Sequence, residues 1–433
     1  MVTLTEPTFL PPSDPLRPFL HHLPHARPLP RIRLPAWVMH LAVRHLGTSR
    51  EEELAHLRLL AEGADLELEG LAGDFLRLRL GRGLLRWERH TEFSTYTLVQ
   101  GLPETPLEGD PALWLAVDPL WLRGIPGRTI LALELILVPG PVEEGLEVAR
   151  RWLGPGPMMA SLIGREQYGL VATDFRARAS GLERIIAVLR PGTTETRAGR
   201  VAMRLLEMET YRMMASLGFP VARELLGFLQ QAERRLAEIT AEIRDRNRAD
   251  AHLLDELEAL AAEVEHLLAE HTSRFGASRA YQALVQERLA ELREAPIPGV
   301  QTLGEFLNRR FRPAMTTVDS VANRLLALSE RIAEATALLR TRVDIALEGQ
   351  NQAILARIQK GQEMQYRLQR TVEGLSVAAI SYYVLGLLGY GFKALKEAGL
   401  PLAPEVATGL ALPLVVLGVW GFMRRIHRQL FHP

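Results

Sequence analysis

Hydrophobic positions in residues 31–190 come as short runs separated by turn residues, a pattern typical of strands. The strand-like runs are Trp37–Leu46, Phe75–Leu80, Leu84–Val99, Leu113–Val117, Thr129–Val138, Met158–Gly164, Tyr168–Phe175 and Leu182–Leu189. Helical spacing appears at Ser49–Glu62 and Val142–Leu153. Strands mixed with a few helices predict an α+β (mixed α/β) domain built on one sheet over residues 31–190.

After Pro191-Gly192 the pattern becomes helical and stays so to the end of the chain. Apolar residues step by four and three from Leu225 to Ile243 and again from Leu253 to Leu267. A second seam contains Val318, Val321, Leu325, Leu328, Ile332, Ala335 and Leu339. Such spacing predicts long antiparallel or coiled-coil helices, with a break at Pro296–Gly299. We therefore expect a helical stalk over residues 191–373.

Two uncharged apolar stretches follow, at residues 374–392 and 406–423. Their lengths are 19 and 18 residues, close to the ~20 helical residues that cross a bilayer. A buried soluble helix can also be uncharged for that length, but two in succession favour a transmembrane hairpin over residues 374–423. Glycines spaced by three, Gly386 with Gly389 and Gly418 with Gly421, predict close helix packing in the membrane.

Basic residues flank both predicted spans. Arg357, Lys360, Arg367 and Arg370 precede the first, and residues 424–433 form a basic tail after the second. Because positive charge near span ends stays on the cytoplasmic side, we expect both termini in the cytoplasm and the hairpin in the inner (cytoplasmic) membrane. The start of the sequence has no signal-peptide pattern that contradicts this orientation.

Composition excludes several functions. The 51 basic residues balance 51 acidic ones, which argues against a nucleic-acid partner. The absence of cysteine rules out disulfides, thiol catalysis and cysteine-ligated metals. Phosphate-loop, nucleophile-elbow and zinc-protease motifs are missing, so no catalytic residue and no cofactor are predicted. His21, His22 and His25 stand in a proline-rich segment over residues 1–30, which favours a loop over a metal site.

One group of side chains is suited to metal binding or proton transfer. If Arg86–Phe93 is a strand, Glu88, His90 and Glu92 share one face. Two carboxylates about an imidazole are suited to a divalent cation or a proton donor. The alternative, which the pattern favours, is a polar sheet face paired with neighbouring arginines.

Residues 350–369 are rich in glutamine and contain few apolar residues that would form a seam. Around a symmetric bundle, these amides would line a hydrated vestibule. A plain solvated helix leading into the membrane is the simpler interpretation.

Several segments together resemble a known family: Arg86–Phe93, Ala160–Phe175, Leu339–Asp344, Thr371–Ser376 and Tyr382-Tyr383. They resemble a bacterial family of uncharacterised membrane-anchored proteins, domain of unknown function 3422, from His25-Ala-Arg-Pro28 to the hairpin. The resemblance implies an architecture and no activity. This architecture is more distantly similar to that of CorA-type divalent-cation channels. In this chain, Gly389-Tyr390-Gly391-Phe392 stands where those channels have a Gly-Met-Asn motif.

The expected function is therefore that of a non-enzymatic membrane protein that contacts the lipid bilayer and assembles as a homo-oligomer through its helical stalk. A CorA-like ion channel without the Gly-Met-Asn motif is the alternative. A membrane-tethered enzyme that uses Glu88, His90 and Glu92 is the third.

Overall fold

A computed structural model describes residues 14–17, 29–61, 73–102, 115–245, 249–398, 401 and 403–431. The chain divides into two compact units, residues 1–247 with 255–335, and residues 248–254 with 336–433. The sheet and the helical residues that follow it up to residue 335, except 248–254, belong to the first unit. The last strand of the sheet ends at Leu189, one residue before the predicted end of the sheet domain at residue 190.

The described part of the first unit contains an eight-stranded sheet in the order β2-β3-β4-β1-β5-β8-β7-β6. Its strands are β1 (Ala36–Arg44), β2 (Phe75–Leu80), β3 (Gly83–Arg89), β4 (Phe93–Gly101), β5 (Arg128–Pro139), β6 (Met159–Ile163), β7 (Gly169–Ala177) and β8 (Glu183–Leu189). Neighbouring strands are antiparallel except β5 and β8, which are parallel. This sheet, followed by long helices, confirms the predicted α+β class.

Two strand predictions need correction. The single run Leu84–Val99 is two strands, because the chain turns at residues 90–92 between β3 and β4. The run Leu113–Val117 lies partly outside the described residues, and residues 115–117 form no strand. The predicted helix at Ser49 begins as expected in α2 (Arg50–Ala61), where Ser49 and Glu52 bond each other's backbone N–H in a capping box.

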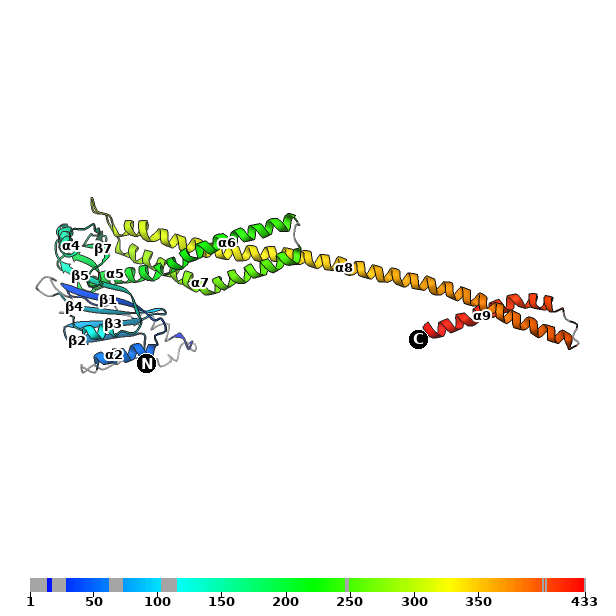
Figure 1. Cartoon of the computed structure of the whole chain (residues 1–433). Coiled ribbons are helices and arrows are strands. Elements are labelled where there is room, and N and C mark those ends of the chain that lie inside the picture. The colour runs from blue at the N-terminus through cyan, green and yellow to red at the C-terminus, as the bar shows by residue number, and fades with distance from the viewer. Residues whose placement is uncertain are drawn as a thin grey trace, which may run out of the picture. The chain divides into compact units, whose positions relative to one another are not determined.

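Helices cover both faces of the sheet (Figure 1). One face shares a hydrophobic core with α2, α3 (Pro119–Arg123) and α4 (Gly145–Leu153). The short 3-10 helix η3 (Val142–Glu144) leads into α4. On the other face lies α5 (Glu195–Ser216), which buries twelve of its residues. A Cβ added at Gly199 would collide with the carbonyl oxygen of Pro30, so α5 also contacts the chain leading into β1.

Helices α6 (Gly218–Asp245), α7 (Asp250–Leu292) and the first part of α8 (Leu303–Glu397) pack side by side. Residues of α8 further along the chain pair with earlier residues of α7: Arg279 with Asp319, and Glu265 with Ser329. The two helices are therefore antiparallel, as the seams predicted. The seam residues Val318, Leu325 and Ile332 are each 1% exposed.

The second unit contains the rest of α8 and α9 (Pro404–Phe431). Both helices are long and apolar enough to cross a membrane, and they contain the predicted spans 374–392 and 406–423. At most 6% of the most apolar window in either helix is buried inside the chain. A core helix of a soluble protein is mostly buried, so the exposure of these two apolar helices distinguishes them from core helices.

Candidate functional site

The three predicted ligands Glu88, His90 and Glu92 lie near the β3–β4 turn but do not converge. Glu88 forms an ion pair with Arg86, and Glu92 forms one with Arg274 of α7. Nε2 of His90 is 3.8 Å from Oε2 of Glu88. The predicted alignment on one strand face is wrong, because the strand ends at Arg89. Among the described residues, no three histidine, aspartate or glutamate side chains are placed to hold a metal ion.

Glu88 borders a cavity of about 110 Å³ between α5 and strands β1, β3 and β4. The cavity is smaller than the ~300–1,000 Å³ of a typical small-molecule site. Arg86 is 5% exposed, donates to Sδ of Met203 at 3.4 Å and lies 5.2 Å from the centre of the Phe75 ring. A buried ion pair of this kind costs desolvation energy that its partners must offset, and removal of one partner leaves a buried charge.

His40 lies in the wall of this cavity, and its protonation state follows from its neighbours. The hydroxyl of Thr210 donates to the carbonyl of Leu206 at 2.8 Å, so its oxygen accepts from Nε2 of His40 at 2.9 Å. Nδ1 then accepts from the hydroxyl of Thr97 at 2.8 Å. Burial, followed by the positive charge of Arg86, lowers the pKa of His40 from 6.5 to about 3. The imidazole is therefore neutral and fully bonded, which suits a core residue better than a proton carrier.

Glu207 of α5 also faces the cavity and connects the sheet domain to α7. Its Oε2 accepts from Nε of Arg288 at 2.6 Å. Burial raises the pKa of Glu207, and the charge of Arg288 opposes that rise. Arg204 of α5 pairs in the same way with Glu291, at 2.9 Å. These pairs hold α7 against α5 over the cavity.

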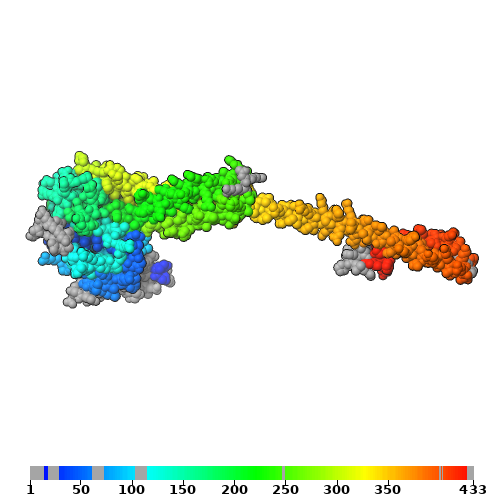
Figure 2. Space-filling model, viewed as in Figure 1, coloured from blue at the N-terminus to red at the C-terminus, as the bar shows by residue number. Residues whose placement is uncertain are grey.

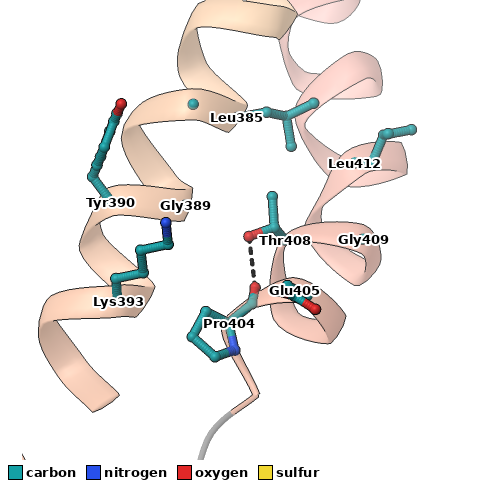
Figure 3. A pocket seen from close by; sticks show the side chains of 10 residues that line it. Leu385, Gly389, Tyr390, Lys393, Pro404, Glu405, Thr408, Gly409 and Leu412 are labelled. Carbon is teal, nitrogen blue, oxygen red and sulfur yellow. Dashed lines mark hydrogen bonds between the residues drawn. The ribbon is translucent and has the colours of Figure 1, made fainter. Parts of the chain in front are cut away.

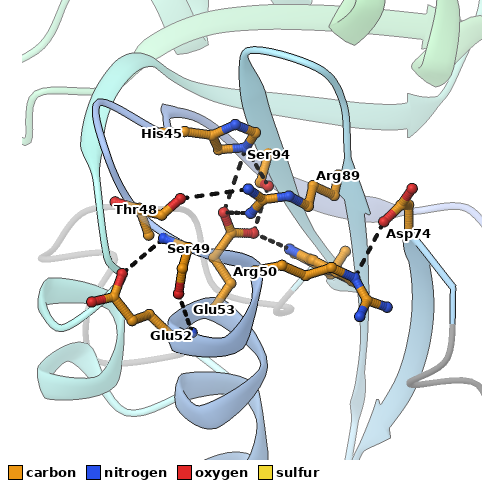
Figure 4. Close-up of polar contacts among 10 residues, drawn as sticks. His45, Thr48, Ser49, Arg50, Glu52, Glu53, Asp74, Arg89 and Ser94 are labelled. Atoms are coloured by element: carbon orange, nitrogen blue, oxygen red, sulfur yellow. Dashed lines mark hydrogen bonds and ion pairs between the residues drawn. The ribbon is translucent and has the colours of Figure 1, made fainter.

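A second buried carboxylate, Glu53 of α2, lies on the other face of the sheet (Figure 4). It is 1% exposed. Ser94 Oγ donates to it at 2.6 Å and Trp87 Nε1 at 3.2 Å, and Arg89 forms an ion pair with it. His45 Nε2 lies 3.4 Å away. Because four side chains surround one carboxylate, Glu53 joins α2 to the β3–β4 hairpin and has no open side for a substrate.

A cavity of about 490 Å³ lies between α8 and α9 in the second unit (Figure 3). Gly389 faces α9 there: an added Cβ would lie 3.7 Å from Oγ1 of Thr408. A Cβ at Gly386, Gly418 or Gly421 would meet nothing within 4 Å. Of the four predicted packing glycines, only Gly389 therefore joins the two helices of one chain. Packing between copies through the other three stays a prediction.

A comparison with protein families gives one match. The model of the family described as "Protein of unknown function (DUF3422)" matches residues 12–430. The chain belongs to this family. The match confirms the family resemblance, whereas a bacterial source and a CorA-like architecture stay expectations. No curated protein matches the chain.

Membership of the DUF3422 family assigns no role to any residue described above. Sequence reasoning missed His40 and Glu53. The residues preceding α2 did contain a capping signal, but Glu53 points inward and its partners come from β3 and β4. His40 is a single polar residue in the apolar strand β1. No local sequence pattern shows that Thr210, 170 residues away, is its hydrogen-bond partner. His21, His22 and His25 lie outside the described residues.

Proposed function

We propose that this DUF3422 protein is a non-enzymatic protein anchored in the bacterial inner membrane, where it assembles as a homo-oligomer and presents its sheet domain to the cytoplasm. The observation that carries the proposal is the exposure of the two apolar helices. Leu387, Leu410 and Leu414 are 72%, 72% and 73% exposed. Full burial of one such side chain contributes about 1.5–3 kcal/mol, so a lipid environment stabilises the hairpin strongly.

The basic residues that flank the hairpin support the orientation. Arg367 and Arg370 precede the first span, and Arg424 and Arg425 follow the second. In the connecting loop, two lysines are offset by Glu397 and Glu405. The excess of arginine before the first span and after the second favours cytoplasmic termini.

The polar residues of the sheet core support a non-enzymatic role. Two deeply buried ionisable side chains have partners from other elements: His40 has two threonines, and Glu53 has a tryptophan, an arginine and a serine. Glu134 of β5 likewise accepts from Trp37 at 3.0 Å and from Arg184 at 2.7 Å. Groups that are saturated by neighbouring side chains stabilise the fold and are poorly suited to attack a substrate.

Topology mapping tests the proposal directly, because the chain contains no cysteine. Two single-cysteine variants, Ala398→Cys in the loop and Ile426→Cys after the second span, are exposed to a membrane-impermeant maleimide in intact spheroplasts. We expect labelling at 398 only, and labelling at 426 after permeabilisation. Labelling at 426 in intact spheroplasts would overturn the orientation. Ion flux into proteoliposomes above the protein-free level would replace the proposal with the channel alternative.

A further inference from the structure

The part of α8 that precedes the apolar hairpin has a second seam, which none of the residues that the structure describes covers. From Leu347 to Leu375, nine residues spaced alternately by four and three positions lie along one face of the helix. We call this set the distal seam. Its six apolar members are Leu347, Ile354, Ile358, Leu368, Val372 and Leu375, which are 51% to 67% exposed. The other three are Asn351, Gly361 and Gln365, also exposed. In the space-filling view, residues 340–365 form a column one helix wide (Figure 2).

The distal seam exists only because α8 is continuous. The helix passes through Gly349, Gly361 and Gly374 without a break, although glycine costs about 1 kcal/mol in a helix interior. The distal seam is also not an extension of the buried one. Leu339 and Leu347 are eight residues apart instead of seven, so the repeat changes register between them. The face that α6 and α7 cover is therefore not the face that the distal seam presents.

We propose that the distal seam is the interface between copies of this chain, which associate there as a parallel, in-register helical bundle. The inference rests on the membrane anchoring proposed above. Copies held by the same hairpin in the same bilayer leave it in the same direction. Identical residues then stand at the same height above the membrane, which is the geometry that a parallel coiled coil requires. A partner of different sequence has no such constraint on its register.

The polar members of the distal seam favour an identical partner. Three-four spacing places Asn351, Ile358, Gln365 and Val372 at one core position (a), and Leu347, Ile354 and Leu368 at the other (d). An amide both donates and accepts hydrogen bonds, so Asn351 or Gln365 pairs with its own copy. A single asparagine at an a position is known to specify register and the number of helices. The polar layers thus select the aligned arrangement over a shifted one.

The charges of the segment are also distributed as this interface requires. Lys360, Glu363, Arg367 and Arg370 all lie on the side of the helix away from the distal seam. The positions that flank the seam hold the neutral residues Leu355, Gln362, Met364 and Gln369, and the charged residues there are Glu348 and Arg357. Identical chains place like residues near one another, so neutral flanks avoid repulsion between copies. The interface thus accounts for Gln362, Gln365 and Gln369, whereas Gln352 and Gln359 lie on the outer side of the helix.

Disulfide trapping in the full-length protein, in lipid nanodiscs or liposomes, tests the interface. Ile354→Cys and Ile358→Cys place the only thiol of the chain in the seam, and Ala356→Cys places it on the opposite side of the same helical turn. With a mild oxidant, we expect the two seam variants to form disulfide-linked dimers several-fold faster than the control. Equal rates at all three positions would overturn the proposed interface.

Light scattering on the detergent-solubilised full chain supplies a second measurement. Ile354→Glu with Leu368→Glu should lower the mass of the assembly. Gln352→Glu with Gln359→Glu adds the same charge on the outer side and should leave the mass unchanged. An oligomer whose mass neither pair changes refutes the distal seam but leaves the proposed homo-oligomer intact. A monomer in both detergent and bilayer refutes the homo-oligomer and the seam together.

Discussion

The two compact units contain helices with the same three-four spacing, yet they differ in what covers the apolar positions. In the first unit, Leu325 is 1% exposed and lies in the part of α8 that packs beside α6 and α7. In the second unit, Leu368 of the same helix is 67% exposed. Periodicity therefore predicts that a helix has an apolar face and where that face lies. It does not say whether the partner is in the same chain, in the membrane or in another copy.

The same contrast holds for polar side chains. Buried groups of the first unit, such as His40 and Glu53, are bonded by residues distant in the sequence. Asn351 and Gln365 of the second unit are exposed. The described polar groups of the first unit thus find partners within one chain, whereas the second unit, by our proposals, needs a bilayer and further copies. Four experiments test this difference.

The largest effect is expected from truncation after Gln369, which removes both apolar spans. The remaining chain should move from the membrane pellet to the soluble fraction and keep its fold, because the first unit buries its own seams. A carbonate wash followed by circular dichroism measures both properties. Retention of the fragment in the pellet, without aggregation, would show that the membrane anchor lies elsewhere.

Truncation of one seam side chain in each half of α8 should affect stability differently in the two units. We expect Leu325→Ala to lower the free energy of unfolding of the first unit by about 2–5 kcal/mol, since a buried leucine leaves a cavity. Leu368→Ala, the matched substitution in the distal seam, should leave that value within about 0.5 kcal/mol of wild type. Urea unfolding, followed by fluorescence of the buried Trp37 and Trp87, provides the measurement. Equal losses in both variants would contradict the division.

Acid should destabilise the first unit through His40. Its pKa is 6.5 in the unfolded chain and about 3 in the folded one, so below pH 6.5 the unfolded state binds a proton that the folded state does not. The free energy of unfolding then falls by about 1.4 kcal/mol per pH unit as the pH drops from 6.5 toward 3. In His40→Gln, whose amide can bond both threonines, this part of the slope should be absent. A variant with the wild-type slope would show that another group causes the loss.

The smallest effect is expected at the surface of the helical bundle. Glu233 of α6 accepts from Nε and Nη2 of Arg324 at 3.0 and 2.8 Å, and this hydrogen bonding lowers the pKa of Glu233. The pair therefore stabilises the bundle above the usual glutamate pKa and loses this contribution as the pH falls through the lowered value. Because both side chains are about one-third exposed, Glu233→Gln should cost less than about 1 kcal/mol, and high salt should remove the difference. Thermal melts at two salt concentrations measure it.

Sequence reasoning identified the sheet domain, the helical stalk with its break at Pro296–Gly299, and the two apolar helices. These features depend on neighbours along the chain: alternation marks a strand, three-four spacing marks a helix, and a long uncharged run marks a candidate span. The same reasoning joined β3 and β4 into one strand, because Arg89 to Glu92 contain no glycine or proline to mark the turn. That error alone produced the predicted alignment of Glu88, His90 and Glu92.

The sequence by itself thus determined which segments form helices and strands, and which faces of them are apolar. Only the tertiary structure decided which partners those faces and polar groups have. Thr210 reaches His40 across 170 positions of the chain, and Glu53 meets Ser94 across 41. The continuity of α8 likewise aligned the spaced apolar residues of the glutamine-rich stretch along one exposed face of the helix, where local sequence reasoning predicts no seam. Local patterns record the physics of a few turns, whereas partner choice depends on packing between segments that the sequence keeps far apart.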